Sequence, residues 1–166
     1  MVELFEKEGF QPSLLDRLTD DKPNKKVASL QRRVLSLQEF KKNVMRDLEW
    51  LLNAGHLESR QDLSDYPQVK RSVLNFGMPD LSGMSASSVD DTTLEFVLRQ
   101  AILNFEPRIL PKSLKINVIN RKEHDKYNVI VFEVQGELWS QPVPERLYLK
   151  TILDLKLGNV EVKLGD

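Results

Sequence analysis

The sequence predicts an α+β fold in which an N-terminal arm and two amphipathic helices pack on a four-stranded, mainly antiparallel sheet. Apolar residues recur every three or four positions over residues 36–53 and 92–105, the spacing of one buried helix face. After Pro111 the apolar period shortens to two, as in strands that bury one side. A chain of 166 residues can build one core. We therefore divide it into an arm, residues 1–35, and a single domain, residues 36–166.

The arm carries apolar residues that glycine, proline and charged residues repeatedly interrupt. Ser13 is a suitable N-cap for a short helix over residues 13–18, because its hydroxyl can accept a hydrogen bond from a free amide of the first turn. The apolar residues are too sparse to offset the cost of ordering the backbone, about 1–2 kcal/mol per residue. We therefore expect the arm to be poorly packed in isolation and to order on a partner.

The first long helix is expected from Ser36 to Asn53. Ser36 and Glu39 have the spacing of a capping box, and apolar residues follow at helical spacing. Gly55 suits the left-handed position that commonly follows a helix. Trp50 lies off the apolar face, so it either packs under the arm, the interpretation we favour, or anchors a partner.

The second long helix is expected to begin at an Asp91 or Thr92 cap and to end before Pro107, which lacks the amide hydrogen that a helix needs. Pro107 also favours extended geometry at the residue before it. Glu106 and Arg108 should therefore leave the helix on a stiff, charged corner. Such a corner can hold an internal salt bridge or dock a partner, and the residues alone favour neither role.

The sheet is predicted from segments in which apolar and polar residues alternate, separated by turn-forming residues. A charged turn separates the first two strands, which form a hairpin, and Gly158-Asn159 turns the third strand into the fourth. The alternating segments are residues 114–118, 130–134, 147–153 and 160–164, and the charged turn is residues 120–126.

Composition excludes several classes of function. The formal net charge is −1, from 24 basic and 25 acidic residues, so no basic field would gather nucleic acid. Cysteine is absent, no apolar run approaches a membrane span, and the N-terminus lacks a basic secretory signal. We therefore expect a cytoplasmic protein that neither binds nucleic acid nor inserts into a membrane.

No constellation in the sequence supports catalysis. The two histidines, His56 and His124, lack companions at metal-ligand spacing, and no nucleophile motif or phosphate-binding glycine loop is present. None of the acidic residues lies among the glycines and aromatics that would build a sugar cleft. We expect a protein without enzymatic activity, metal or cofactor.

Four segments together carry a family resemblance: residues 12–18, residues 47–53, the irregular apolar loop at residues 72–83, and the Glu106-Pro107-Arg108 corner. In this order and spacing they resemble the TssE family of type VI secretion baseplate proteins. That family is similar to the small wedge protein of contractile phage tail baseplates, and both carry the historical label "lysozyme-like". The resemblance extends from about Leu4 to Val162.

The resemblance implies a structural subunit with two kinds of partner. Glu106, Pro107 and Arg108 would hold the protein to a helical core formed by wedge proteins of the TssF, TssG and TssK type, with Arg108 as the energetic centre. The sheet would pair with a strand of the contractile sheath proteins and so start sheath polymerisation. The location implied is the cytoplasmic face of the inner membrane. The loop supplies the other candidate partner-binding residues, which are Leu74, Asn75, Gly77, Pro79 and Asp80.

Two other functions remain open at this point. An anti-adaptor of regulated proteolysis has a similar fold and a similar Glu-Pro-Arg corner, which would make the chain a regulatory binding module. The historical label leaves a peptidoglycan hydrolase as the least favoured function. For the baseplate role we expect Arg108→Ala to weaken wedge binding and to leave the fold intact, because Arg108 lies beyond the helix-ending proline.

Overall fold

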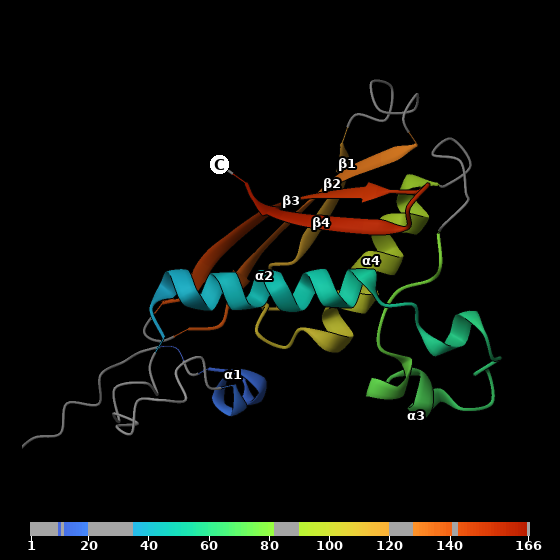
Figure 1. Cartoon of the computed structure of the whole chain (residues 1–166), viewed down its shortest axis with the longest axis horizontal. Helices are drawn as coiled ribbons and strands as arrows, with labels where there is room; N and C mark the ends of the chain where they lie inside the picture. Colours follow the sequence, from blue (N-terminus) through green and yellow to red (C-terminus); the bar gives the residue numbers. More distant parts are fainter. Residues whose placement is uncertain are drawn as a thin grey trace, which may run out of the picture.

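The computed structural model describes residues 10, 12–19, 35–81, 90–119, 128–140 and 143–165. Four strands form one antiparallel sheet in the order β1-β2-β3-β4, and helices cover it, which confirms the predicted α+β class (Figure 1). The elements are α1 (Leu14–Leu18), α2 (Leu37–Asn53), η2 (Leu57–Ser59), α3 (Pro67–Lys70), η3 (Val73–Asn75), α4 (Asp91–Phe105), β1 (Lys115–Ile119), β2 (Val129–Leu138), β3 (Glu145–Asp154) and β4 (Asn159–Leu164).

The helices α1 and α2 begin where the sequence predicts. Ser13 caps α1 and Ser36 caps α2, each in a capping box in which the third helical residue returns a carboxylate to the cap. The cap of α4 is Asp90, whose side chain accepts from the amide of Thr93, so the prediction of Asp91 or Thr92 is wrong by one or two positions. Aspartates at neighbouring positions offer the same chemistry, and pattern alone does not choose between them.

The end of α2 differs from the prediction. Ala54, with a φ of −91° and a ψ of 132°, is the C-cap residue, and the chain continues extended. Gly55 is not left-handed; among the described glycines, Gly77 and Gly158 have a positive φ. Gly158 turns β3 into β4 as predicted, with a φ of 63°. The charged turn predicted at 120–126 lies outside the described residues.

The long central pair of strands sets the register of the sheet. β2 and β3 pair over ten positions each, from Val129↔Asp154 to Leu138↔Glu145. The edge strand β1 pairs with β2 from Lys115↔Gln135 to Ile119↔Val131, and β4 pairs with β3 from Asp154↔Asn159 to Leu149↔Leu164. One residue in two along each strand therefore faces the helices.

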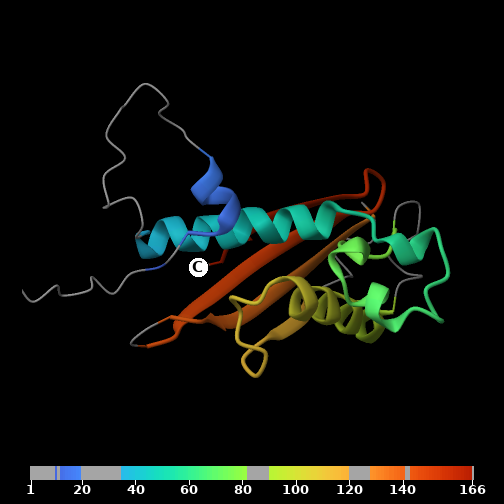
Figure 2. The ribbon, with the colours of Figure 1, turned by 90° about the horizontal axis from the view of Figure 1, so that it is seen from below.

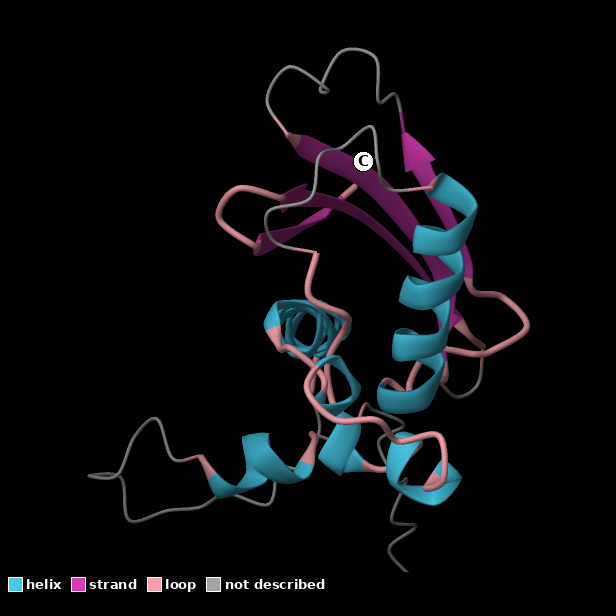
Figure 3. Cartoon of the chain, turned by 90° about the vertical axis from the view of Figure 1, so that its right-hand side faces the viewer, coloured by secondary structure: helices cyan, strands magenta, loops and turns pink. Residues whose placement is uncertain are grey.

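The two long helices, α2 and α4, lie on the same face of the curved sheet, and the core lies between them and the strands (Figure 3). Phe132 in β2, Leu149 in β3 and Leu98 in α4 are fully buried at its centre. The other face of the sheet carries exposed side chains such as those of Arg146 and Lys150. This one-sided burial produces the alternation seen in the sequence.

The short helical elements α1, α3 and η3 lie on the side of α2 and α4 away from the sheet (Figure 1). Figures 1 and 2 show α1 beside the middle of α2, and α3 with η3 beyond the C-terminal end of α2. No helix among the described residues is long and apolar enough to cross a membrane. The short elements and the corner after α4 together form the surface that carries the candidate site.

Candidate partner-docking site

The corner after α4 contains an ion pair between Glu106 and Arg108. The chain leaves the helix at Glu106, whose amide still donates to Ile102, and Pro107 then blocks continuation. Glu106 is only 3% exposed. Its Oε1 accepts from the backbone amide of Arg108 at 3.1 Å and from Nε of Arg108 at 2.6 Å, while Oε2 accepts from Nη2 of the same side chain. The internal salt bridge considered from the sequence is therefore present.

Helix α2 contributes the next member of the network. Asp47 Oδ2 accepts from Arg108 Nη2 at 2.6 Å, although 61 residues separate the two in the sequence. The other oxygen, Oδ1, accepts from Arg46 Nε at 2.9 Å and Nη2 at 2.7 Å. Asp47 thus bridges two guanidinium groups, and both of its oxygens have charged donors.

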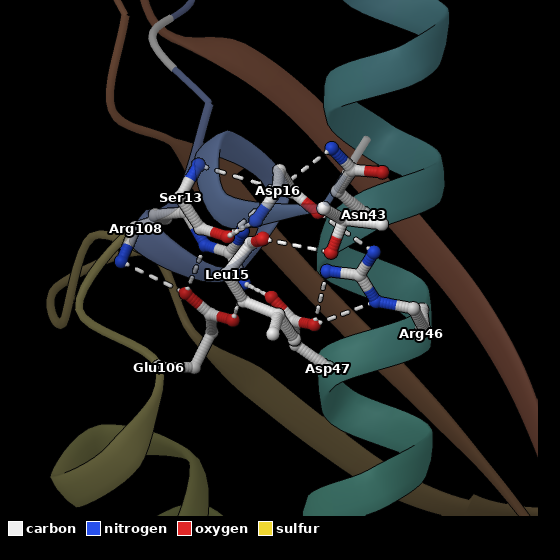
Figure 4. A network of polar contacts seen from close by, with 9 residues as sticks. Ser13, Leu15, Asp16, Asn43, Arg46, Asp47, Glu106 and Arg108 are labelled. Atoms are coloured by element: carbon white, nitrogen blue, oxygen red, sulfur yellow. Dashed lines mark hydrogen bonds and ion pairs between the residues drawn. The ribbon is translucent and has the colours of Figure 1, made fainter. Parts of the chain in front are cut away.

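The network ends on α1. Arg46 Nη1 donates to Asp16 Oδ1 at 2.8 Å, and Asn43 Nδ2 donates to Asp16 Oδ2 at 3.0 Å (Figure 4). Polar contacts therefore connect the N-terminal helix with the corner after α4, through a single turn of α2. We call this set the charge network: Asp16, Asn43, Arg46, Asp47, Glu106 and Arg108.

Asp16 and Arg108 have pKa values that are shifted toward the charged state. Burial pushes the pKa of Asp16 upward, but hydrogen bonds from Arg46 and Ser13 and the charge of Arg46 hold it below its usual range. Burial would lower the pKa of Arg108, yet its bonds to Glu106 and Asp47 raise it. Asp16 and Arg108 are therefore charged at neutral pH.

Acid is expected to release α1. Because the folded pKa of Asp16 is depressed, its contribution to docking is present above the ordinary aspartate pKa and is lost as pH falls below about 4. Amide exchange at Arg17 and Thr19, whose N–H groups bond within the α1 turn, measures this release. Asp16→Asn is the control: it should loosen α1 at neutral pH and abolish the acid step. An unchanged acid step in that variant would contradict the prediction.

An apolar groove runs beside the charge network. Trp50 and Leu51 of α2, Leu15 of α1, and the rings of Phe76 and Phe105 line it, with Glu106, Pro107 and Arg108 at one wall. Phe76 contacts Phe105 edge to face, with centroids 5.4 Å apart. Trp50 is 51% exposed and carries the Arg46 guanidinium over its ring at 5.0 Å. Leu15 of the arm lines the same groove as Trp50, and most of residues 1–35 lie outside the described residues, so the expectation that Trp50 packs under the arm stays a prediction.

Two of the three leucines of α1, Leu14 and Leu18, face outward. Asp16 is the residue that holds the helix to α2, and no residue of α1 is buried. Leu14 and Leu18 are 70% and 75% exposed. Leu15, by contrast, lines the groove.

Comparison with known proteins identifies the family of the chain. The sequence matches the family described as baseplate wedge protein gp25 over residues 38–143, which is more than half of the chain. The chain belongs to the gp25 baseplate wedge family. No curated protein and no solved structure matches it. The family is a structural baseplate family, and the matched range contains Asp47, the groove aromatics and the whole Glu106-Pro107-Arg108 corner.

The loop residues that were predicted to bind a partner differ in how far they are exposed. Leu74 is exposed, at 67%, near the groove residue Phe76. Asn75 is buried and structural: its Oδ1 accepts from the amide of Glu58 at 2.9 Å, and its Nδ2 donates to the carbonyl of Lys70 at 3.0 Å. Side-chain hydrogen bonds of Asn75 thus fix the loop to its neighbours.

Gly77, Pro79 and Asp80 lie away from the groove. Pro79 and Asp80 line a second, polar depression at the C-terminal end of α2, together with His56 and Gly158. His56 serves the local backbone, since its Nδ1 accepts from the amide of Ser59 at 3.0 Å. Gly77 packs against the chain that leaves α2. Of the residues predicted to bind a partner, Glu106, Pro107 and Arg108 line the groove, whereas Leu74, Asn75, Gly77, Pro79 and Asp80 do not.

Sequence reasoning missed Asp16, Arg46 and Asp47. Each lies among other charged residues in the sequence, and nothing local marks it as a member of a network. The one usable signal was that residues 12–18 and 47–53 belong to the same family pattern as the corner. Spatial neighbourhood explains that grouping, because all three segments supply groups to the charge network.

Proposed function

We propose that the chain is a non-catalytic structural subunit of a type VI secretion baseplate, and that it docks on wedge proteins of the TssF, TssG and TssK type through the apolar groove. The observation that carries the proposal is an exposed aromatic groove bordered by a fully paired charge network. Family membership supports the baseplate role. The assembly would lie at the cytoplasmic face of the inner membrane, with residues 1–35 as an arm that reaches a neighbour.

The groove has the character of a protein interface. Aromatic and arginine side chains dominate binding energy at interfaces, especially where neighbouring groups exclude water. Trp50 and Phe76 offer partly exposed rings, and Arg108 lies half-buried beside them with its charge already compensated. A helix from a wedge protein can cover the exposed parts of these rings while the neighbouring ions keep their partners.

Glu106 is poorly suited to hydrolysis. A glycosidase acid needs a protonated carboxyl at neutral pH, usually obtained by burial without a positive neighbour. Both oxygens of Glu106 instead accept hydrogen bonds from Arg108, so this carboxyl group is buried beside a positive neighbour. The corner therefore supports a binding role over the hydrolase alternative.

The sheet supports the second part of the proposal, strand pairing with a contractile sheath protein. Each edge of an open antiparallel sheet presents backbone donors and acceptors to which an extended segment can add. In this chain the edge strands are β1 and β4. Sheath polymerisation would start when one of them accepts a strand.

Trp50→Ala is expected to weaken binding to the wedge proteins by about 2 kcal/mol, roughly 30-fold, because aromatic residues at interface centres commonly have that value. Its free energy of unfolding should change by less than about 1 kcal/mol, since half of the side chain is already exposed. Titration of purified wedge complex with the variant, alongside chemical unfolding, measures both quantities.

Phe96→Ala is the matched control, since Phe96 is 62% exposed on α4 and does not line the groove. Equal losses in the two variants would place the interface elsewhere. Absence of any binding by the unaltered chain to wedge proteins would favour the regulatory binding module of anti-adaptor type.

A further inference from the structure

The edge of β4 exposes its backbone groups in a fixed alternation. The amide of Gly165 donates to the carbonyl of Tyr148 at 3.0 Å, which continues the β3–β4 ladder beyond Leu164. In an antiparallel ladder, alternate residues bond to the neighbour and the others point outward. Val160, Val162 and Leu164 therefore direct their N–H and C=O groups away from β3.

Asn53, the last residue of α2, occupies the outward groups of Val160. Its Oδ1 accepts from the Val160 amide at 2.8 Å, and its Nδ2 donates to the Val160 carbonyl at 2.8 Å. Nδ2 also donates to the carbonyl of Glu49 at 2.8 Å, which fixes the orientation of the amide group. One side chain thus makes the pair of bonds that a residue of an adjacent strand would make.

The opposite edge, on β1, is closed at both ends by α4. Glu95 accepts from the amide of Val118 at 2.9 Å. Arg99 donates to the carbonyls of Leu114 and Pro111. In the part of the chain that the structure describes, the outward groups of Val162 and Leu164 on β4 have no such helix side chain bonded to them. Of the two edges, β4 beyond Val160 is the more open.

We propose that Asn53 is a register stop for strand addition at β4, which rests on the strand pairing proposed above. An extended segment of the sheath protein would pair with Val162 and Leu164 and end where the Asn53 amide already holds Val160. Leu164 is 57% exposed, so the incoming strand needs an apolar residue on that face.

The charges on the solvent-facing side of β4 indicate which residues the incoming strand should carry. Lys163 lies directly opposite Lys150 in the register, and like charges in that arrangement are unfavourable. Glu161 contacts Lys163 at 3.0 Å and offsets part of this repulsion. An acidic residue in the incoming strand beside Lys163 would compensate the rest. The partner segment is therefore an extended strand with an acidic residue on one face and an apolar residue on the other.

The register is tested by measuring amide hydrogen exchange of the chain with and without the sheath protein of the same system. In the unaltered chain, binding should slow exchange at Val162 and Leu164 and leave Val160 unchanged. In Asn53→Ala, the Val160 amide should exchange faster in the free protein and become protected on binding, because the strand can then extend by two residues. If Asn53 were merely structural, the variant would lose stability without any change in the protected set, and the proposal would fail.

A proline substitution tests the edge itself. Leu164→Pro removes an outward N–H and leaves the ladder with β3 intact, so sheath binding should fall about 3- to 10-fold, the value of one hydrogen bond. Leu164→Ala, which keeps the N–H, is the control for the side chain. Protection at Leu114, Ile116 and Val118 instead would overturn the choice of edge while leaving strand pairing in place. No sheath binding at all would contradict strand pairing itself, and wedge binding would still be measured separately.

Discussion

Arg108→Ala is expected to lower the free energy of unfolding by about 2–4 kcal/mol, because it leaves the buried carboxylate of Glu106 without its positive partner. Asp47 also loses one of its two arginines but keeps Arg46. Urea unfolding followed by circular dichroism measures the loss. Binding to the wedge proteins should weaken as well, since Arg108 forms part of the groove wall.

A second substitution separates the two effects. In Glu106→Gln with Arg108→Ala, no uncompensated charge is buried, so most of the lost stability should return. Wedge binding should remain weak in the double variant if Arg108 contacts the partner. Recovery of both stability and binding would show that Arg108 is an internal brace, and the docking role would then rest on Trp50 and its aromatic neighbours.

This expectation differs from the one that the sequence alone supports. The position of Arg108 beyond a helix-ending proline suggested a side chain removable without cost to the fold. The structure shows it bonded to Glu106 and to Asp47. Local sequence pattern gives no sign of a contact between residues that lie 61 positions apart. The sequence could therefore compare an internal salt bridge with a docking role, but it could not exclude that Arg108 does both.

The fold was predictable where one local rule governs an element. Helical spacing and a Ser-to-Glu capping box located α2 within one residue, and two-residue alternation gave the strands and their antiparallel order. Prediction was poorest at the ends of helices, where several neighbouring residues offer the same chemistry. Asp90 caps α4 in place of its acidic neighbour, and Ala54 ends α2 without a left-handed glycine.

The candidate site was predictable in part for a related reason. Proline marked the corner, and opposite charges marked its ion pair. The docking of α1 could not be foreseen, because a short helix with outward leucines and an inward aspartate reverses the usual amphipathic rule.

The charge network also couples the position of α1 to that of the corner after α4. Asp16 fixes Arg46, Arg46 helps to fix Asp47, and Asp47 helps to fix Arg108. A partner that moved α1 would therefore alter the support of Arg108, and the reverse would hold equally. Loss of α1 docking and loss of the corner should accordingly be non-additive in a double-variant cycle.

Gly77→Ala is expected to destabilise the protein by about 3 kcal/mol or more, because the residue is strained and crowded at once. Its φ is +123°, a conformation that side chains rarely adopt. An added Cβ would lie 2.8 Å from the carbonyl carbon of Ala54 and 2.9 Å from the amide nitrogen of His56, both backbone atoms that cannot turn aside. Relief would separate the two segments and break the bonds between Met78 and residues 54 and 56.

Gly55→Ala is the matched control, only one residue beyond Ala54. Its Cβ would meet nothing within 4 Å, and its φ is not positive, so its stability should change by less than about 1 kcal/mol. Thermal unfolding of the two variants gives the comparison directly. If Gly77→Ala kept its stability and lost only wedge binding, Gly77 would be a docking residue as the sequence suggested. A large loss of stability, with binding per folded molecule unchanged, would assign it to the packing that holds the loop against the end of α2.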